Sequence, residues 1–157
     1  MKELREYRTS LINRLVNSAR QFRSECLAAK DAFAPLGADG WNIHQVAVHT
    51  RDVHLLVYGS RVRRTAIETD PEFQNFDGEA YMAEHYSAGE PLEEILDGLV
   101  HHVESLADML RELPSEAWAR TSRHVMLGRG LTLQSWVEKD LAHIEEHLGT
   151  IRKQKGD

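Results

Sequence analysis

Hydrophobic residues recur at helical spacing along most of the chain, and the clearest such segment covers residues 131–153. Its apolar side chains repeat at steps of three and four, and they are Leu133, Val137, Leu141, Ile144, Leu148 and Ile151. An α-helix has about 3.6 residues per turn, so these positions form one stripe along a helix. A second stripe lies beside the first and holds Trp136, Asp140, His143 and His147. We expect one long amphipathic helix with two histidines on one side.

The same spacing predicts three further long helices. The first covers roughly residues 2–30, where no Gly or Pro interrupts the pattern. The second begins after Asn42, a good N-cap, and Gln45 three residues later completes a capping box. This helix should cover residues 43–68, and another should cover residues 91–113. Four long helices in a chain of this length indicate an all-α fold.

The second helix carries apolar residues on two sides. Its main apolar face comprises Ile43, Val46, Val53, Leu56, Val57 and Ile67. A second stripe, roughly opposite, comprises Val48, Leu55, Tyr58 and Val62. We expect the second stripe to pack on a connecting segment or on another subunit. His49 falls within the main face, whereas His44 is expected to point to solvent and His54 to lie at the edge.

Two connections link these helices. Residues 70–89 form a long one, in which Asp77 could cap a short helix over residues 78–87. Residues 115–130 are expected to form a short helical turn followed by an irregular or extended piece. Thr132 should then cap the last helix.

His143 and His147 are four residues apart, so on a helix their imidazoles point the same way and can reach one metal ion. Ile144 stands where a metalloprotease HExxH helix has its glutamate. The alternative is a pair of histidines at the rim of a bundle core. His49 lies among apolar neighbours and must find a partner or lose hydration free energy, and a metal would serve. His102 is a weaker candidate for a further ligand.

The positions of these histidines test the topology. His49 lies about two turns into the second helix, whereas His143 and His147 lie in the second half of the last one. Parallel helices that start level would leave these groups roughly 7–12 Å out of step, whereas antiparallel helices bring them close. An up-down-down-up bundle makes these two helices antiparallel, and it needs a long crossover between the second and third helices. Residues 69–90 are long enough. We therefore predict an up-down-down-up four-helix bundle whose crossover contains a short helix.

Composition bounds the remaining possibilities. The chain has 157 residues, which suits a single domain over residues 1–157. Lys and Arg number 19 against 25 Asp and Glu, and the net charge of −6 argues against nucleic-acid binding. Cys26 is the single cysteine, so no internal disulfide can form. The chain shows neither a signal peptide at its start nor an apolar run long enough for a membrane. A cytoplasmic protein without membrane contact is the expectation.

The chain resembles the DinB/YfiT-like family of metal-binding four-helix bundles. The resemblance rests on Trp41 at the start of the second helix, His49 eight positions later, and the His143-x-x-x-His147 pair after an LTLQSWV entry. It covers essentially the whole chain. It implies a homodimer with an up-down-down-up bundle and a divalent metal, Zn or Ni, held by these three histidines. Many members have Gln three residues after the last histidine, where this chain has Thr150.

Three histidine ligands leave one coordination position open, which is typical of catalytic sites. A metal there could hold a thiol as thiolate or activate a water molecule. Some relatives are transferases or isomerases that use mycothiol or bacillithiol, so the resemblance suggests a metal-dependent thiol S-transferase acting on small electrophiles. The alternatives are a non-catalytic metal-binding or stress-related dimeric module, and a bundle whose histidines bind nothing.

No side chain is singled out by the sequence as a catalytic acid or base. Asp140 could orient a ligand histidine from behind, although an exposed helix charge is an equal alternative. Several further side chains could line a substrate pocket, namely Arg61, Tyr81, His85, Tyr86 and His124.

Overall fold

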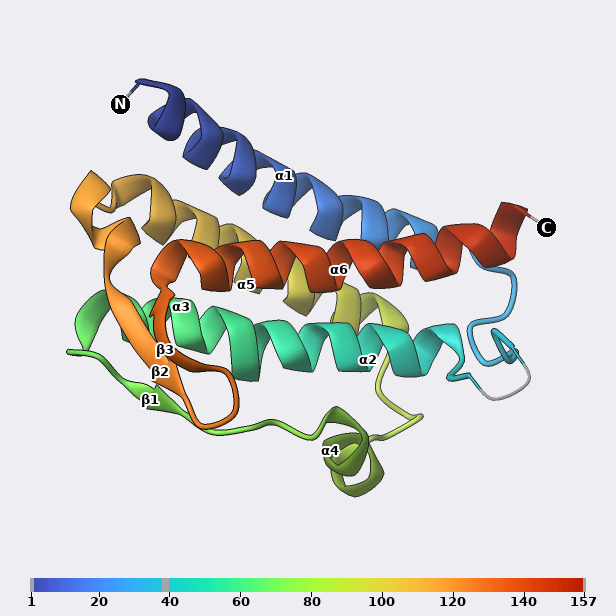
Figure 1. Cartoon of the computed structure of the whole chain (residues 1–157). Helices are drawn as coiled ribbons and strands as arrows, with labels where there is room; N and C mark the ends of the chain where they lie inside the picture. Colours follow the sequence, from blue (N-terminus) through green and yellow to red (C-terminus); the bar gives the residue numbers. More distant parts are fainter. Residues whose placement is uncertain (1, 38–39, 157) are drawn as a thin grey trace.

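The computed structural model describes residues 2–37 and 40–156, and its long helices form a four-helix bundle (Figure 1). The first, third and fourth long helices are α1 (Lys2–Leu27), α5 (Leu92–Glu112) and α6 (Leu133–Gly156). The second is a continuous helical segment made of α2 (Ile43–Val53), the π-helical turn η1 (His54–Tyr58) and α3 (Gly59–Ile67). α1 and α6 run one way, and the α2–α3 segment and α5 run the other way (Figure 1). The predicted up-down-down-up bundle is confirmed.

The core lies between these four helical segments. α1 packs against α5 and α6, and the α2–α3 segment packs against the same two helices. The apolar stripe predicted for the last helix is buried throughout, at Leu133, Val137, Leu141, Ile144, Leu148 and Ile151. Within the described residues, no helix combines the length and apolar character needed to span a membrane.

The second long helix begins as its sequence predicts. The Asn42 side chain accepts a hydrogen bond from the Gln45 backbone N–H at 2.8 Å, and the Gln45 side chain accepts one from the Asn42 N–H at 2.9 Å. This reciprocal pair satisfies backbone donors that have no partner inside the helix. The helix ends at Ile67, one residue before the predicted end.

The π-helical turn in the middle of this helix was not predicted, and it alters which side chains are buried. A π-turn places more residues in one turn than an α-turn, so every later side chain is rotated relative to an uninterrupted α-helix. Leu56 and Ile67, both predicted on the main apolar face, are 44% and 81% exposed. Val62 and Thr65 are buried beyond the turn instead. The prediction for Leu56 and Ile67 was therefore wrong.

The long crossover is folded onto the bundle. It contains β1 (Glu72–Phe73) and α4 (Gly78–His85), and the Asp77 side chain caps α4 by accepting a hydrogen bond from the Ala80 N–H at 3.1 Å. α4 packs against α2 on the side of His49, whereas Leu55 of the predicted second apolar stripe is 41% exposed. The short helix is therefore confirmed, two residues shorter than predicted.

His44 shows how the crossover is held in place. Its ring is only 1% exposed, so the expectation that it points to solvent was wrong. Its Nε2 lies 2.7 Å from the Glu90 carbonyl oxygen, which can only accept, so Nε2 is the donor. The Tyr86 hydroxyl then donates to Nδ1, also at 2.7 Å. The sequence does not reveal this burial, because residues about 40 positions away cover the ring.

A small three-stranded sheet closes one end of the bundle (Figure 1). After the short 3₁₀ helix η2 (Ser115–Ala119), β2 (Thr121–His124) and β3 (Gly128–Thr132) form an antiparallel hairpin. β1 of the crossover pairs parallel to β2. The segment expected to be irregular or extended is thus a hairpin, and the strand from the crossover was not predicted. The sheet places the turn between β2 and β3, residues 125–127, beside the bundle.

The π-turn can be tested at Gly59. A Cβ on this residue would lie 2.5 Å from the backbone oxygen of His54, so the π-turn would have to shift. We expect Gly59→Ala to lower the free energy of unfolding by about 1–3 kcal/mol in urea denaturation.

Gly98 in α5 is the matched control, because a Cβ there meets only Cδ of Arg51 at 3.8 Å. Gly98→Ala should raise the free energy of unfolding by roughly 0.5–1 kcal/mol, as expected for Gly to Ala inside a helix. Stabilisation by both substitutions would show that the π-turn does not require glycine.

Candidate metal centre

Three histidine side chains converge between α2 and α6. Nε2 of His49 lies 3.2 Å from Nε2 of His143, and Nε2 of His147 lies 3.1 Å from the same atom. One ligand atom of each residue lies within 4.8 Å of those of the other two. We call His49, His143 and His147 the histidine cluster. The structure thus brings together the three residues that the sequence singled out.

The spacing of these nitrogen atoms fits a metal ion. Zinc–nitrogen bonds of about 2.0–2.1 Å in a tetrahedral site place two ligand nitrogens about 3.3 Å apart. The two Nε2–Nε2 separations are close to that value. Three imidazoles also supply the nitrogen donors that Zn and Ni accept. The residues present therefore fit a divalent metal with one or more further positions open.

The cluster keeps its histidines neutral. Burial, together with the neighbouring His147, lowers the pKa of His49 to about 4. Burial and the neighbouring histidines lower the pKa of His143 to about 3, and burial lowers the pKa of His147. Neutral imidazoles have the free lone pair that metal coordination requires. At neutral pH the cluster is ready to accept a cation.

Neighbouring residues hold the His49 ring in place. The Trp41 ring lies against it, with the two ring centres 4.9 Å apart. Gly78, the first residue of α4, lies so close that a Cβ there would be 3.0 Å from Cε1 of His49. The crossover thus packs directly on a residue of the cluster, so the long connection that permits the topology also shapes the site.

The sequence left two alternatives for Asp140, a role in orienting a ligand histidine or an exposed charge on the helix; it is buried, and its hydrogen bond goes to a different residue. Its Oδ2 lies 2.7 Å from Nδ1 of His54, and both side chains are buried. Burial alone would lower the pKa of His54, but the charge of Asp140 and the hydrogen bond to it raise the pKa above its ordinary value. His54, expected at the edge of its helix, is therefore half of a buried ion pair beneath the cluster. The spacing of residues in the sequence does not predict this pair.

Two sealed polar atoms lie on α6 close to the cluster. Nδ1 of His143 and Oδ1 of Asp140 are shielded from solvent and have no hydrogen-bond partner among the described residues. If Nε2 of His143 binds a metal, its Nδ1 carries the proton and needs an acceptor. The two residues are three apart on one helix, so Asp140 is a nearby acceptor on the same face.

A cavity of about 280 Å³ opens beside the cluster. His49 and His143 form part of its wall, and the remainder comes from the α2–α3 segment, the crossover and the turn at residues 125–127. Of the predicted pocket residues, Arg61 and His124 line it. We call this cavity the cluster cavity.

The remaining predicted residues lie elsewhere. The rings of Tyr81 and His85 stack on each other at 4.0 Å on α4, and Tyr86 bonds to His44. None of the three is among the residues that line the cluster cavity. His102 does not belong to the metal-ligand group found in the described part of the chain.

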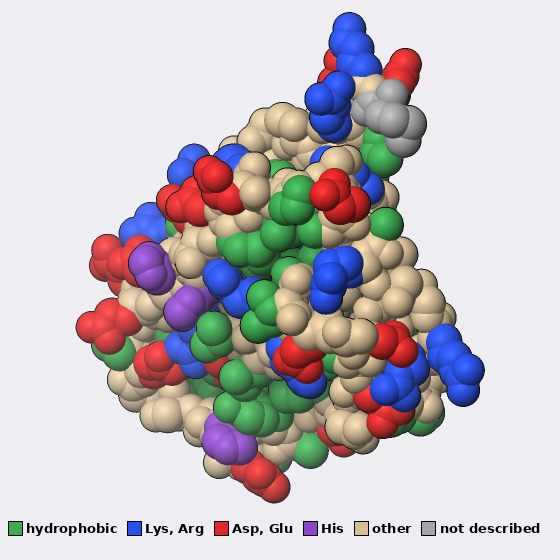
Figure 2. Space-filling view, turned by 90° about the vertical axis from the view of Figure 1, so that its left-hand side faces the viewer, with side chains coloured by type: hydrophobic (Ala, Val, Ile, Leu, Met, Phe, Trp, Pro, Cys, Tyr) green, Lys and Arg blue, Asp and Glu red, His purple; other side chains and the backbone are tan. Residues whose placement is uncertain are grey.

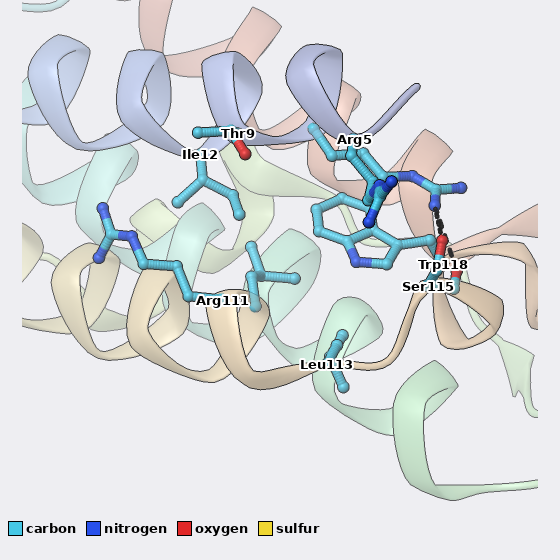
Figure 3. Close-up of a pocket in the computed structure, with 9 residues that line it drawn as sticks. Arg5, Thr9, Ile12, Arg111, Leu113, Ser115 and Trp118 are labelled. Atoms are coloured by element: carbon cyan, nitrogen blue, oxygen red, sulfur yellow. Dashed lines mark hydrogen bonds between the residues drawn. The ribbon is translucent and has the colours of Figure 1, made fainter. Parts of the chain in front are cut away.

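A second cavity, of about 380 Å³, lies between α1 and α5 at the Trp118 ring (Figure 3). Arg8 borders it, but Nε and Nη1 of Arg8 already donate to Gln134 and Ser115, and its guanidinium lies over the Trp118 ring. Arg8 thus ties α1 to η2 and α6. This cavity is larger than the cluster cavity, but no group of metal-ligating side chains lines it, so it is not the candidate site.

The surface at the sheet end carries charges of both signs. Figure 2 shows basic and acidic side chains interspersed over this face, with apolar side chains between them. A nucleic-acid interface would require basic side chains gathered into a stripe or patch. This face does not show that arrangement.

The fold and the site together define a four-helix bundle that holds three histidines between its second and last long helices. Residues 15–146 match the family described as the mycothiol maleylpyruvate isomerase N-terminal domain, and the chain belongs to that family. The DinB/YfiT-like resemblance stated from the sequence is confirmed. No curated protein matches the chain.

One solved structure shares the whole architecture. It is YfiT from Bacillus subtilis, described as a "probable metal-dependent hydrolase with an unusual four-helix bundle topology". The TM-score is 0.86, with 20% sequence identity over 95% of this chain and 86% of YfiT. At this level of identity the match shows the fold.

Removal of one cluster histidine tests the metal centre. We expect His143→Ala to lower metal affinity by more than about 100-fold, since even the outer partners of ligand histidines contribute 10–100-fold. Helical content measured by circular dichroism should stay unchanged. His101→Ala is the control, because His101 is exposed on α5. Stoichiometric metal retained by His143→Ala would refute the assignment.

Acid should destabilise the metal-free protein. In the unfolded chain each cluster histidine takes up a proton near pH 6.5, whereas in the folded protein His49 and His143 stay neutral until about pH 4 and 3. The unfolded state therefore binds more protons between these limits, and the free energy of unfolding falls as pH is lowered below 6.5. Urea denaturation with a chelator, at pH 7.0 down to 5.0, measures this slope. His143→Asn should make it shallower, and an unchanged slope would contradict the explanation.

Proposed function

We propose that the histidine cluster binds one divalent metal ion and that the chain uses it for a metal-dependent reaction on a small molecule in the cluster cavity. The observation that supports this most is the convergence of three neutral Nε2 atoms next to a cavity of about 280 Å³. Structural zinc sites are closed by four protein ligands, whereas catalytic sites retain an open position. A group of three histidines is of the second kind.

The metal would supply Lewis-acid chemistry, which makes a thiol or a water molecule nucleophilic at neutral pH. The chain itself has three tasks. The cluster residues hold the metal, with rings kept neutral by burial. Trp41 and Gly78 fix the ring of His49. The apolar side chains of the cluster cavity limit access of water to the reacting atoms.

The first candidate reaction is transfer of a low-molecular-weight thiol to a small electrophile. The family takes its description from a mycothiol-dependent isomerase, which supports a thiol as the second substrate. In this reaction the thiol sulfur forms a bond to an electrophilic carbon and the leaving group departs with its electron pair. The thiol proton passes to solvent.

Hydrolysis is the second candidate, and the likeness to YfiT supports it. The same centre would then make water the nucleophile, and no thiol would be needed. The two reactions differ in their second substrate, so one set of assays can separate them.

The first measurement is metal analysis of protein purified without a histidine tag. One divalent ion per chain, removed by a chelator and restored by Zn²⁺ or Ni²⁺, is the expected result. Absence of metal under all loading conditions would overturn the proposal and leave a bundle whose histidines bind nothing.

The second measurement is turnover by the metal-loaded protein. Monochlorobimane with a panel of small thiols tests thiol transfer, and p-nitrophenyl acetate without thiol tests hydrolysis. We expect thiol transfer to require the metal and to be lost in His143→Ala but retained in His101→Ala. Ester hydrolysis without thiol transfer would favour the hydrolase. Metal binding without either activity would favour a non-catalytic metal-binding module.

A further inference from the structure

Arg61 is a buried cation without an acidic partner. Its side chain is only 8% exposed, and its guanidinium lies 4.8 Å from the centre of the Trp136 ring and 5.7 Å from that of Phe73. Its one hydrogen bond runs from Nη2 to the Gln74 carbonyl oxygen at 3.0 Å. Among the described residues, no Asp or Glu lies within ion-pair distance of it. Aromatic rings stabilise the charge in part, but a buried cation is usually paired.

Arg61 has N–H groups without a hydrogen-bond partner among the described residues, and it lines the cluster cavity. A guanidinium has five N–H donors, and one hydrogen bond accounts for a single one of them. Some side-chain nitrogen and oxygen atoms of the described residues are fully buried and lack a hydrogen-bond partner, and no Arg61 nitrogen belongs to that group. A molecule bound in the cluster cavity would therefore lie beside a buried cation with hydrogen-bonding capacity to spare.

The tautomer of His124 follows from its hydrogen bonds. The backbone N–H groups of Met126 and Leu127 both donate to its Nδ1, at 3.0 and 3.1 Å. A nitrogen that accepts carries no proton, so Nε2 carries it and is a donor. The turn at residues 125–127 therefore fixes the tautomer of this ring. His124 also lines the cluster cavity.

The rest of the wall is largely apolar. Val53, Val57 and Phe76 line the cavity together with Met126 and Leu127 of the turn. Met126 and Leu127 are themselves 75% and 55% exposed, so this part of the wall lies at the molecular surface. A volume of about 280 Å³ suits a molecule smaller than a typical drug.

We propose that Arg61 and His124 form an anion subsite that binds the carboxylate of a small substrate with an apolar body. The bidentate geometry of a guanidinium matches a carboxylate, and His124 adds a neutral donor. The subsite positions the substrate so that its reacting part reaches the histidine cluster. This inference rests on the proposed function for its role in catalysis, but binding of the carboxylate requires no metal.

Direct binding to the metal-free full chain tests the subsite. In the presence of a chelator, 4-phenylbutyrate is titrated into ¹⁵N-labelled protein, and its neutral amide, 4-phenylbutyramide, is titrated in parallel. We expect the carboxylate to bind at least 10-fold more tightly than the amide. NMR chemical-shift changes should occur at Arg61, at His124 and in the turn at residues 125–127. Phenyl phosphate distinguishes a subsite for planar carboxylates from one that accepts any oxyanion, and binding tighter than that of the carboxylate would overturn the stated class.

Substitutions then identify the residue responsible. Arg61→Met keeps an unbranched apolar chain against the aromatic rings and should reduce carboxylate affinity at least 10-fold, with no effect on the amide. Arg61→Lys should restore part of it. Arg63→Met is the control on the same helix, because Arg63 is exposed and, among the described residues, donates only to Ser105. If circular dichroism shows that Arg61→Met does not fold, the comparison of carboxylate and amide binding to the unaltered chain decides whether the subsite recognises a carboxylate.

Equal affinity for carboxylate and amide, or unchanged carboxylate binding by folded Arg61→Met, would overturn the subsite. These results are distinguishable from failure of the proposed function. Carboxylate binding that depends on Arg61 without metal binding by the histidine cluster would support the subsite and refute the metal centre. The reverse pattern would retain the metal centre and refute the subsite.

Discussion

The organisation of this protein depends on one geometric constraint, the convergence of imidazoles from two helices that are distant in sequence. His49 lies near the start of its helix and His143 near the middle of α6, so the two meet because these helices are antiparallel. In this bundle the second and third long helices run the same way. A long crossover follows from that. The crossover then packs on the site, because Gly78 lies against the ring of His49.

Buried charge is distributed unevenly around the cluster. Below it, His54 and Asp140 form an ion pair sealed between α6 and the π-turn, so each charge offsets the cost of burying the other. Beside it, the positive charge of Arg61 has aromatic faces and one carbonyl oxygen but no carboxylate. Burial lowers the pKa of Arg61, because it disfavours the charged form of the guanidinium. The first charge thus has a partner of opposite charge, whereas the second lacks one among the described residues and lines a cavity.

The π-turn connects the helix geometry to the site. π-turns inside α-helices occur frequently at functional sites. Here the turn spans His54 and Tyr58, and the Tyr58 ring lies 5.8 Å from that of His143. Arg61, in α3 after the turn, is buried among aromatic rings, whereas Leu56, within the turn itself, is exposed. Because Arg61 follows the turn, its direction relative to His49 depends on the turn.

The sequence by itself determined those features of the fold that short-range interactions control. Helical spacing and the Asn42 capping box located the helices, the spacing of His143 and His147 indicated their shared face, and crossover length indicated the topology. Only the tertiary structure decided which polar side chains are buried and what they contact. The ring of His44 is covered by the crossover, and His54 meets Asp140, which is 86 residues away. Hydrophobic spacing reports the preferences of one segment, whereas the burial of a polar group depends on which distant segment packs against it.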